Sequence, residues 1–169
     1  MTEKSEMLEG LKESLLAERT GSAFYRMTAA NTTDPKAKIV FEAMAKEEDA
    51  HFEFLRIQYR SVSQTGTFAG GITLSDQARL GDSSEIFSPA LRAKISGAHL
   101  EMSALNIAIQ LEVNSVNRYR KLAEKATTPE GKKFFTELVD WEQDHHDSLI
   151  KTQQELGEEY WKSVGFAPT

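Results

Sequence analysis

Apolar residues recur three or four positions apart along four long stretches of the chain, which is the pattern of helices that bury one face. These stretches cover residues 4–31, 35–60, 99–126 and 129–156. Short turns that end in Asp34-Pro35 and Thr128-Pro129 separate the members of each pair, and both dipeptides are typical of helix starts. Two long helices joined by a short turn lie antiparallel. The pattern therefore predicts two helical hairpins, at 4–60 and 99–156.

The segment between the hairpins, residues 61–98, has no sustained helical period and is rich in Gly and Ser. A long connection of this kind is expected to be a crossover between the hairpins, with a short helix starting at Ser88-Pro89. The tail, 157–169, is expected to pack against the bundle or a partner subunit through Tyr160, Trp161 and Phe166. The chain is thus predicted to be a single all-α domain, 1–169, with the fold of a four-helix bundle.

The two hairpins are similar in sequence when residues 17–55 are aligned with residues 111–149. The alignment contains 11 identities in 39 ungapped positions, where chance gives about 2 or 3. Its identical polar pairs include Glu18 with Glu112, Glu48 with Glu142, and His51 with His145. We infer that the chain is a duplicated hairpin.

These six polar residues fall on the inward, otherwise apolar faces of the four predicted helices. Residues equidistant from a turn lie side by side in an antiparallel hairpin, and both Glu pairs are centred on a turn, at residues 33 and 127. Four carboxylates and two imidazoles should therefore meet in one layer of the core. Four ionised carboxylates would repel one another and would cost several kcal/mol each to bury, so a positive group is expected among them.

Two divalent cations would neutralise four carboxylates, and a Glu and a His three residues apart can bind the same ion from one helix face. Oxygen and imidazole ligands favour iron or manganese, with zinc as a substitute. A single E-x-x-H sequence is a weak signal. Two copies in register, each with a Glu 30 residues upstream, are a strong one. The alternative, a surface Glu and an ordinary core His, requires the face assignment to fail on all four helices.

This order of residues on a duplicated hairpin resembles the ferritin-like di-iron carboxylate proteins. The spacing and the absence of cysteine are most similar to rubrerythrins that lack the rubredoxin domain. The resemblance covers roughly 5–60 and 99–156 and implies two iron ions. The chain departs from the rubrerythrin pattern at Ser115, where rubrerythrins carry a further Glu. The resulting six-ligand set is closer to that of bacterioferritin. The resemblance implies two bridging ligands and one terminal Glu–His pair for each ion: Glu48 and Glu142 as bridges, Glu18 with His51, and Glu112 with His145.

Two tyrosines lie two turns from these ligands on the same helix faces, Tyr25 and Tyr119. Their hydroxyls would hydrogen-bond a ligand carboxylate or donate an electron. Alternatively, they are ordinary core tyrosines with hydroxyls satisfied elsewhere. Glu47, Asp49 and Asp144 flank the two motifs and could hold the second nitrogen of a ligand His, but a solvated helix face is the simpler expectation for each.

Composition narrows the classes of function further. The net charge is −6, which argues against general nucleic-acid binding. There is no cysteine, which excludes disulfides, thiol catalysis and a rubredoxin-type iron site. The first ten residues lack the apolar core of a secretory signal, and no run is long and apolar enough to cross a membrane. We therefore expect a cytoplasmic protein.

The resemblance implies an oxidoreductase that acts in the response to oxidative stress and reduces hydrogen peroxide or dioxygen. The catalytic residues would be Glu48, Glu142, Tyr25 and Tyr119. Without a rubredoxin domain, the chain would need an external electron donor. We also expect a homodimer. Two alternatives stay open: a ferroxidase that serves iron storage or delivery, and a structural metal-binding module without redox turnover.

Overall fold

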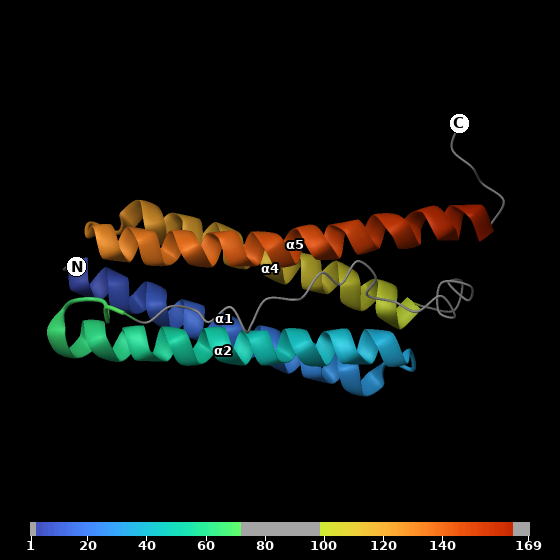
Figure 1. Cartoon of the computed structure of the whole chain (residues 1–169), viewed down its shortest axis with the longest axis horizontal. Coiled ribbons are helices and arrows are strands. Elements are labelled where there is room, and N and C mark those ends of the chain that lie inside the picture. Colours follow the sequence, from blue (N-terminus) through green and yellow to red (C-terminus); the bar gives the residue numbers. More distant parts are fainter. Residues whose placement is uncertain (1–2, 72–98, 164–169) are drawn as a thin grey trace.

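The computed structural model describes residues 3–71 and 99–163, and the statements below concern these residues. They form the helices α1 (Glu3–Asn31), α2 (Pro35–Thr65), α4 (His99–Lys125) and α5 (Pro129–Ser163) (Figure 1). The prediction of an all-α four-helix fold is confirmed. The short helix expected at Ser88-Pro89 lies outside the described residues, as does Phe166. In the part of the chain that is described, no helix is long and apolar enough to span a membrane.

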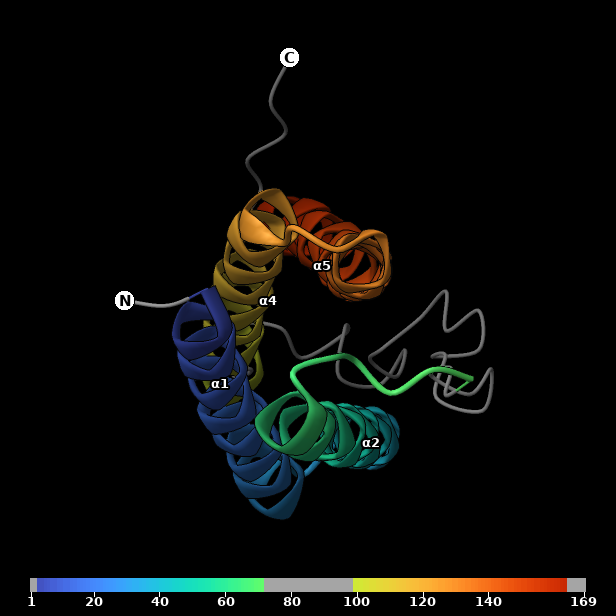
Figure 2. The ribbon, with the colours of Figure 1, turned by 90° about the vertical axis from the view of Figure 1, so that its left-hand side faces the viewer.

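The helices pack as two antiparallel hairpins, α1 with α2 and α4 with α5, and the hairpins meet mainly along α1 and α4. Figure 2 shows α1 and α4 side by side, whereas α2 and α5 lie on the other side of the bundle. Side chains bridge this second side, since Phe54 of α2 packs against Phe134 of α5 with ring centroids 5.0 Å apart. The bundle therefore has one tight backbone contact and one contact made by large side chains.

Short turns set the register within each hairpin. The carboxylate of Asp34 accepts a hydrogen bond from the backbone N–H of Ala37 at 2.7 Å and caps α2, with Pro35 as the first helical residue. At the start of α5, the hydroxyl of Thr128 accepts from the N–H of Gly131 at 3.1 Å. The two helix starts are as predicted, and equal turns place each Glu pair at matching heights.

Two helices extend beyond the ranges expected from the sequence. The helix α2 continues past residue 60 to Thr65, and its end is capped by Gly66, which has φ 79° and donates to the carbonyl of Val62 at 2.9 Å. Burial explains the extension, because Val62 packs in the core and is only 2% exposed. The helix α5 continues past residue 156 to Ser163, so the start of the expected tail is helical. The side chains of Tyr160 and Trp161 lie outside the described residues.

The core consists of two apolar clusters at opposite ends of the bundle, with the six predicted ligands in neither. One cluster contains Tyr25, Phe41, Met44, Leu105 and Leu149 among others. The second includes Leu11, Leu55, Tyr119, Phe135 and Leu138. Phe68, which follows α2, closes the second cluster by packing its ring against those of Phe134 and Phe135.

The cap at the start of α2 gives a test of this register. Replacement of Asp34 by Ala removes the acceptor for the N–H of Ala37 and should cost about 1 kcal/mol of unfolding free energy. For a chain of this size, that loss corresponds to a fall of roughly 2–4 °C in the melting temperature. Asp34→Asn keeps a side-chain oxygen and is the matched control. Equal melting temperatures for the Ala and Asn variants would contradict the role of the cap.

Candidate metal centre

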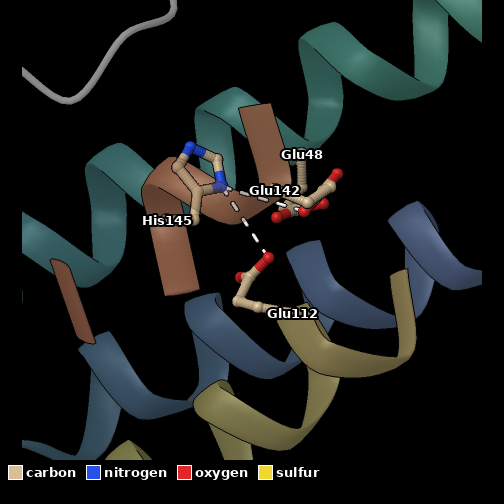
Figure 3. Close-up of side chains that lie close together, drawn as sticks. All are labelled: Glu48, Glu112, Glu142 and His145. Atoms are coloured by element: carbon tan, nitrogen blue, oxygen red, sulfur yellow. Dashed lines mark ion pairs between the residues drawn. The ribbon is translucent and has the colours of Figure 1, made fainter. Parts of the chain in front are cut away.

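The structure brings the six residues predicted as metal ligands into one buried layer. These residues are at most 5% exposed and come from all four helices. Figure 3 shows Glu48, Glu112, Glu142 and His145, whose polar atoms point toward one another from α2, α4 and α5. The remaining two are Glu18 of α1 and His51 of α2. The convergence expected from the helix faces and the two turns is therefore present.

In the first half of the centre, His51 directs its Nδ1 atom at the carboxylates. This atom lies 3.1 Å from Oε2 of Glu18 and 3.3 Å from Oε1 of Glu142. It is 3.9 Å from Oε2 of Glu48, three residues earlier on the same helix. The second half has the same orientation, because Nδ1 of His145 lies 3.8 Å from Glu112 and 3.9 Å from Glu142.

The ligand atoms form two overlapping groups, each compact enough to surround one cation. Within each group the atoms lie within 4.8 Å of one another, and Glu48 belongs to both. One group consists of Glu18, Glu48 and His51, and the other of Glu48, Glu112, Glu142 and His145. A carboxylate shared by two groups can bridge two cations.

Unpaired polar atoms show that the layer fits metal ions. Both oxygens of Glu142 and the Nδ1 atom of His145 are buried without a hydrogen-bond partner in the part of the chain that the structure describes. Each such atom costs roughly 1–3 kcal/mol when it is left unsatisfied. A divalent cation between them would bind all three atoms and would neutralise the carboxylates. The donor set, of carboxylate oxygen and imidazole nitrogen, suits iron, manganese or zinc.

The two buried tyrosines hydrogen-bond to carboxylates of this layer, each on the opposite hairpin. The hydroxyl of Tyr25 donates to Oε1 of Glu112, and the hydroxyl of Tyr119 donates to Oε1 of Glu18. Burial, with the negative charge of the nearby carboxylates, raises the pKa of both tyrosines well above 10. Both therefore remain protonated donors at neutral pH. Of the two interpretations of these tyrosines, the hydrogen bond to a candidate ligand is the one observed.

The four carboxylates divide into two pairs with opposite pKa directions. Burial, followed by the charges of neighbouring carboxylates, raises the pKa of Glu48 and of Glu142 well above 4.5. Burial also pushes the pKa of Glu112 upward, but the neighbouring side chains of His145 and Glu142 and the hydroxyl of Tyr25 outweigh it and bring that pKa to about 2. The pKa of Glu18 is likewise lowered, since His51 outweighs the effect of burial. The shared carboxylate Glu48 and its twin Glu142 thus keep protons when no cation is bound.

Glu47 is a buried neighbour of the centre, and the expectation that it lies on a solvated face is wrong. It is 6% exposed, and its Oε2 atom lies 2.7 Å from Nε2 of His145, although the two groups are not aligned for a good hydrogen bond. Burial lowers the pKa of His145, but Glu112 and Glu47 reverse this effect and raise it to about 10. A fifth carboxylate therefore stands behind one of the two imidazoles.

The other imidazole has an aromatic neighbour in the equivalent place. The repeat aligns Glu47 with Trp141, and the ring of His51 lies 5.0 Å from the ring of Trp141. The Nε2 atom of His51 is buried and has no hydrogen-bond partner among the described residues. Because the repeat aligns Glu47 with the largely apolar Trp141, the sequence contained a signal that position 47 faces the interior.

The other polar residues near the motifs lie away from the centre. Asp49 accepts hydrogen bonds from Ser22 and Arg26 on α1. Asp144 is exposed, as expected. His146 is only partly exposed, and its Nδ1 atom lies 2.9 Å from Asp147. None of these three side chains contacts the six predicted ligands.

Part of the chain matches a known protein family. Residues 103–166 match the family model described as rubrerythrin. This segment contains most of α4 and all of α5, and therefore three of the six predicted ligands. Searches of the curated proteins and of the solved structures gave no match.

Removal of the two central carboxylates tests the assignment of the ligands. The double variant Glu48→Ala/Glu142→Ala should bind less than about one metal ion per chain, because each residue is proposed to contact both ions. Its metal-free fold should be retained or stabilised, since buried repulsion is removed. Metal analysis after iron loading and denaturation of the metal-free protein measure the two effects.

The matched control is Glu42→Ala/Asp144→Ala, which removes one exposed acid from each of the same helices. It changes the net charge equally and should bind two ions. Retention of two ions by the Glu48/Glu142 variant would show that these residues are not ligands.

The stability of the metal-free protein should fall as the pH rises from about 5 to about 10. Glu48 and Glu142 hold protons in the folded state above 4.5, so the folded state binds more protons than the unfolded chain there. His145 likewise binds its proton more tightly in the folded state than in the unfolded chain, between pH 6.5 and about pH 10. Bound cations would replace these protons, so the metal-loaded protein should have a flatter profile. Denaturant titrations across this pH range, with and without metal, measure the difference.

Glu18 and Glu112 have the opposite effect on stability. Their stabilising contribution is present above pH 4.5 and is lost as the pH falls toward about 2. The metal-free protein should thus be most stable in mildly acidic solution. A stability that rises steadily with pH from 5 to 10 would contradict the protonation pattern.

Proposed function

We propose that the chain is a ferritin-like protein of the rubrerythrin family, whose model matches residues 103–166, and that it is a non-haem di-iron oxidoreductase that reduces hydrogen peroxide or dioxygen. One observation supports this proposal above the others. Four carboxylates and two imidazoles share a buried layer, and several of their atoms have no partner in the described residues. Metal ions explain both the buried charge and the unpaired atoms, and a site with two redox-active ions suits the reduction of an O–O bond.

The proposed assignment gives each ion a terminal Glu and His and lets the two ions share the central carboxylates. We assign Glu48 and Glu142 as bridges, Glu18 with His51 to one ion, and Glu112 with His145 to the other. The short distances from the Nδ1 atoms of His51 and His145 to these carboxylates support the assignment. Manganese or zinc could occupy the same ligands.

Two ferrous ions bound there would supply one electron each, so that a peroxide and two protons give two molecules of water. The protein would supply position and charge. The hydroxyls of Tyr25 and Tyr119 hold Glu112 and Glu18 in place from the opposite hairpin. Because both hydroxyls keep their protons, they would serve as fixed proton donors beside the layer. The apolar clusters at both ends of the bundle exclude bulk water along its axis.

The proposed activity needs partners beyond the oxidant. The chain contains no cysteine and therefore no rubredoxin-type iron site, so an external donor must return the electrons. We further propose a homodimer. Exposed apolar residues on α1 and α4 that lie outside the cleft described below, among them Met27, Leu100 and Ile107, support a surface that is covered by a second copy.

The decisive measurement is the reaction of the di-ferrous protein with each oxidant in a stopped-flow spectrometer. The ferric absorbance should appear within seconds of mixing with hydrogen peroxide and at least about tenfold more slowly with dioxygen, as the family relationship favours peroxide. Glu48→Ala/Glu142→Ala is the control for iron outside the site. Absence of reaction with either oxidant over minutes would exclude the proposed activity.

The same protein distinguishes the ferroxidase alternative. A storage protein requires a closed shell of many subunits, whereas the proposed enzyme should sediment as a dimer. Rapid oxidation by dioxygen in a large shell would favour iron storage. Stoichiometric metal binding without any redox reaction would favour a structural metal-binding module.

A further inference from the structure

A cleft between α1 and α4 leads from the surface to the metal centre. It has a volume of about 380 Å³ and is lined by residues of both helices and by Glu48. The cleft reaches Glu48, Glu112 and Tyr25, so its inner end is formed by candidate ligands and one of their hydrogen-bond donors. Its outer part is lined by the apolar side chains of Leu16 and Leu111. The lining therefore combines apolar surface with exposed polar side chains, Glu13, Thr20 and Asn114, and with polar groups of the metal centre.

Small residues keep the cleft open. Gly21 and Ser115 occupy equivalent places in the repeat, on α1 and α4, and both line the cleft. A Cβ atom at Gly21 would lie 3.3 Å from the carboxyl carbon of Glu48, which is tighter than ordinary packing allows. Ser115, three residues after Glu112, likewise contributes only a small side chain to the lining. A volume of this size is large compared with the ~30 Å³ that one water molecule occupies in the liquid.

The cleft is also lined by a cation, Arg118, one nitrogen of which has no partner in the described part of the chain. The Nη1 atom of Arg118 is buried and has no hydrogen-bond partner among the described residues. The other buried atoms without partners belong to the metal centre or to Glu47 beside it. Glu13 lines the same cleft but is exposed and does not bond to this nitrogen. A buried guanidinium nitrogen without an acceptor calls for an explanation, and a small anion is one group that would satisfy it.

Arg118 lies on the same side of α4 as Ser115 and Glu112, at steps of three residues. Side chains on a helix lean toward its N-terminus, so the Arg118 side chain leans back toward Ser115. A guanidinium binds a planar carboxylate through two parallel hydrogen bonds. A singly charged carboxylate suits this place better than a phosphate, because Glu48 and Glu112 would repel a second negative charge.

We propose that the cleft between α1 and α4 binds a small organic carboxylate, which pairs with Arg118 and extends toward Glu48 and Glu112. The hydrocarbon part of such a molecule fits the apolar lining from Leu16 and Leu111. Its carboxylate would stand beside the metal centre, where it can add an oxygen ligand from outside the chain. The contact with metal ions rests on the proposed function, whereas the pairing with Arg118 does not.

The test uses the full chain loaded with Mn²⁺ and ¹³C-labelled acetate as the probe, at constant ionic strength. Paramagnetic relaxation of the acetate carboxyl carbon reports binding near the ions. It should be saturable in the wild type. Arg118→Gln should weaken acetate binding at least about tenfold, because the charge-assisted hydrogen bonds are lost. The matched control Arg120→Gln, an exposed arginine on the same helix, should change the affinity less than about twofold.

A second measurement follows the arginine Nε–H signals of the metal-free protein during an acetate titration. One signal should shift in the wild type and should be absent in Arg118→Gln. Equal acetate affinity in the wild type and Arg118→Gln, or no saturable binding in either measurement, would overturn the proposal and show that the cleft holds water only. If the wild type binds no Mn²⁺, the proposed function fails, and the metal-free titration still decides whether Arg118 binds a carboxylate.

Discussion

Burial of like charges is the constraint on which the rest of this structure depends. Glu18, Glu48, Glu112 and Glu142 share one layer of a helical core, and no arrangement of helices makes four ionised carboxylates stable there without positive charge. In the metal-free state, the layer is held together by protons. Glu48 and Glu142 take up protons of their own, while His51 and the two tyrosines hydrogen-bond to Glu18 and Glu112, and His145 lies beside Glu112. Protons and metal ions are therefore two alternative ways to neutralise the buried carboxylates, and the fold accommodates both.

The geometry of the duplicated hairpin brings the groups of this layer together. Each hairpin contributes one outer Glu, one central Glu and one His, and the equal turns bring them to the same height. The tyrosines then connect the halves, because each donates to the carboxylate of the other hairpin. Neither half can complete its hydrogen bonds alone. The polar layer thus specifies how the two hairpins pair, which the apolar clusters on either side would do less selectively.

Much of the fold and of the site could be predicted from spacing along the chain. Helical periodicity and two short turns determine which residues share a face and a level, and this was enough to bring the six candidate ligands together. Glu47 could not be placed from its own helix, since it becomes buried only because α5 packs across it. The length of α2 depends on the packing of Val62, which local sequence does not reveal. The unpaired nitrogen of Arg118 depends on how side chains of two helices interlock, and periodicity carries no information about that.

The unlike pair Glu47 and Trp141 has a consequence for how such a centre can evolve. In an assembly of two identical hairpins, any substitution behind one imidazole would appear behind the other as well. Fusion of the copies into one polypeptide removes that restriction, because each copy can change alone. Here one histidine has a carboxylate behind it and its twin has an indole. The two halves of the centre have thereby become chemically distinct positions, and the ancestral twofold symmetry survives in the backbone but not in the charge around the ligands.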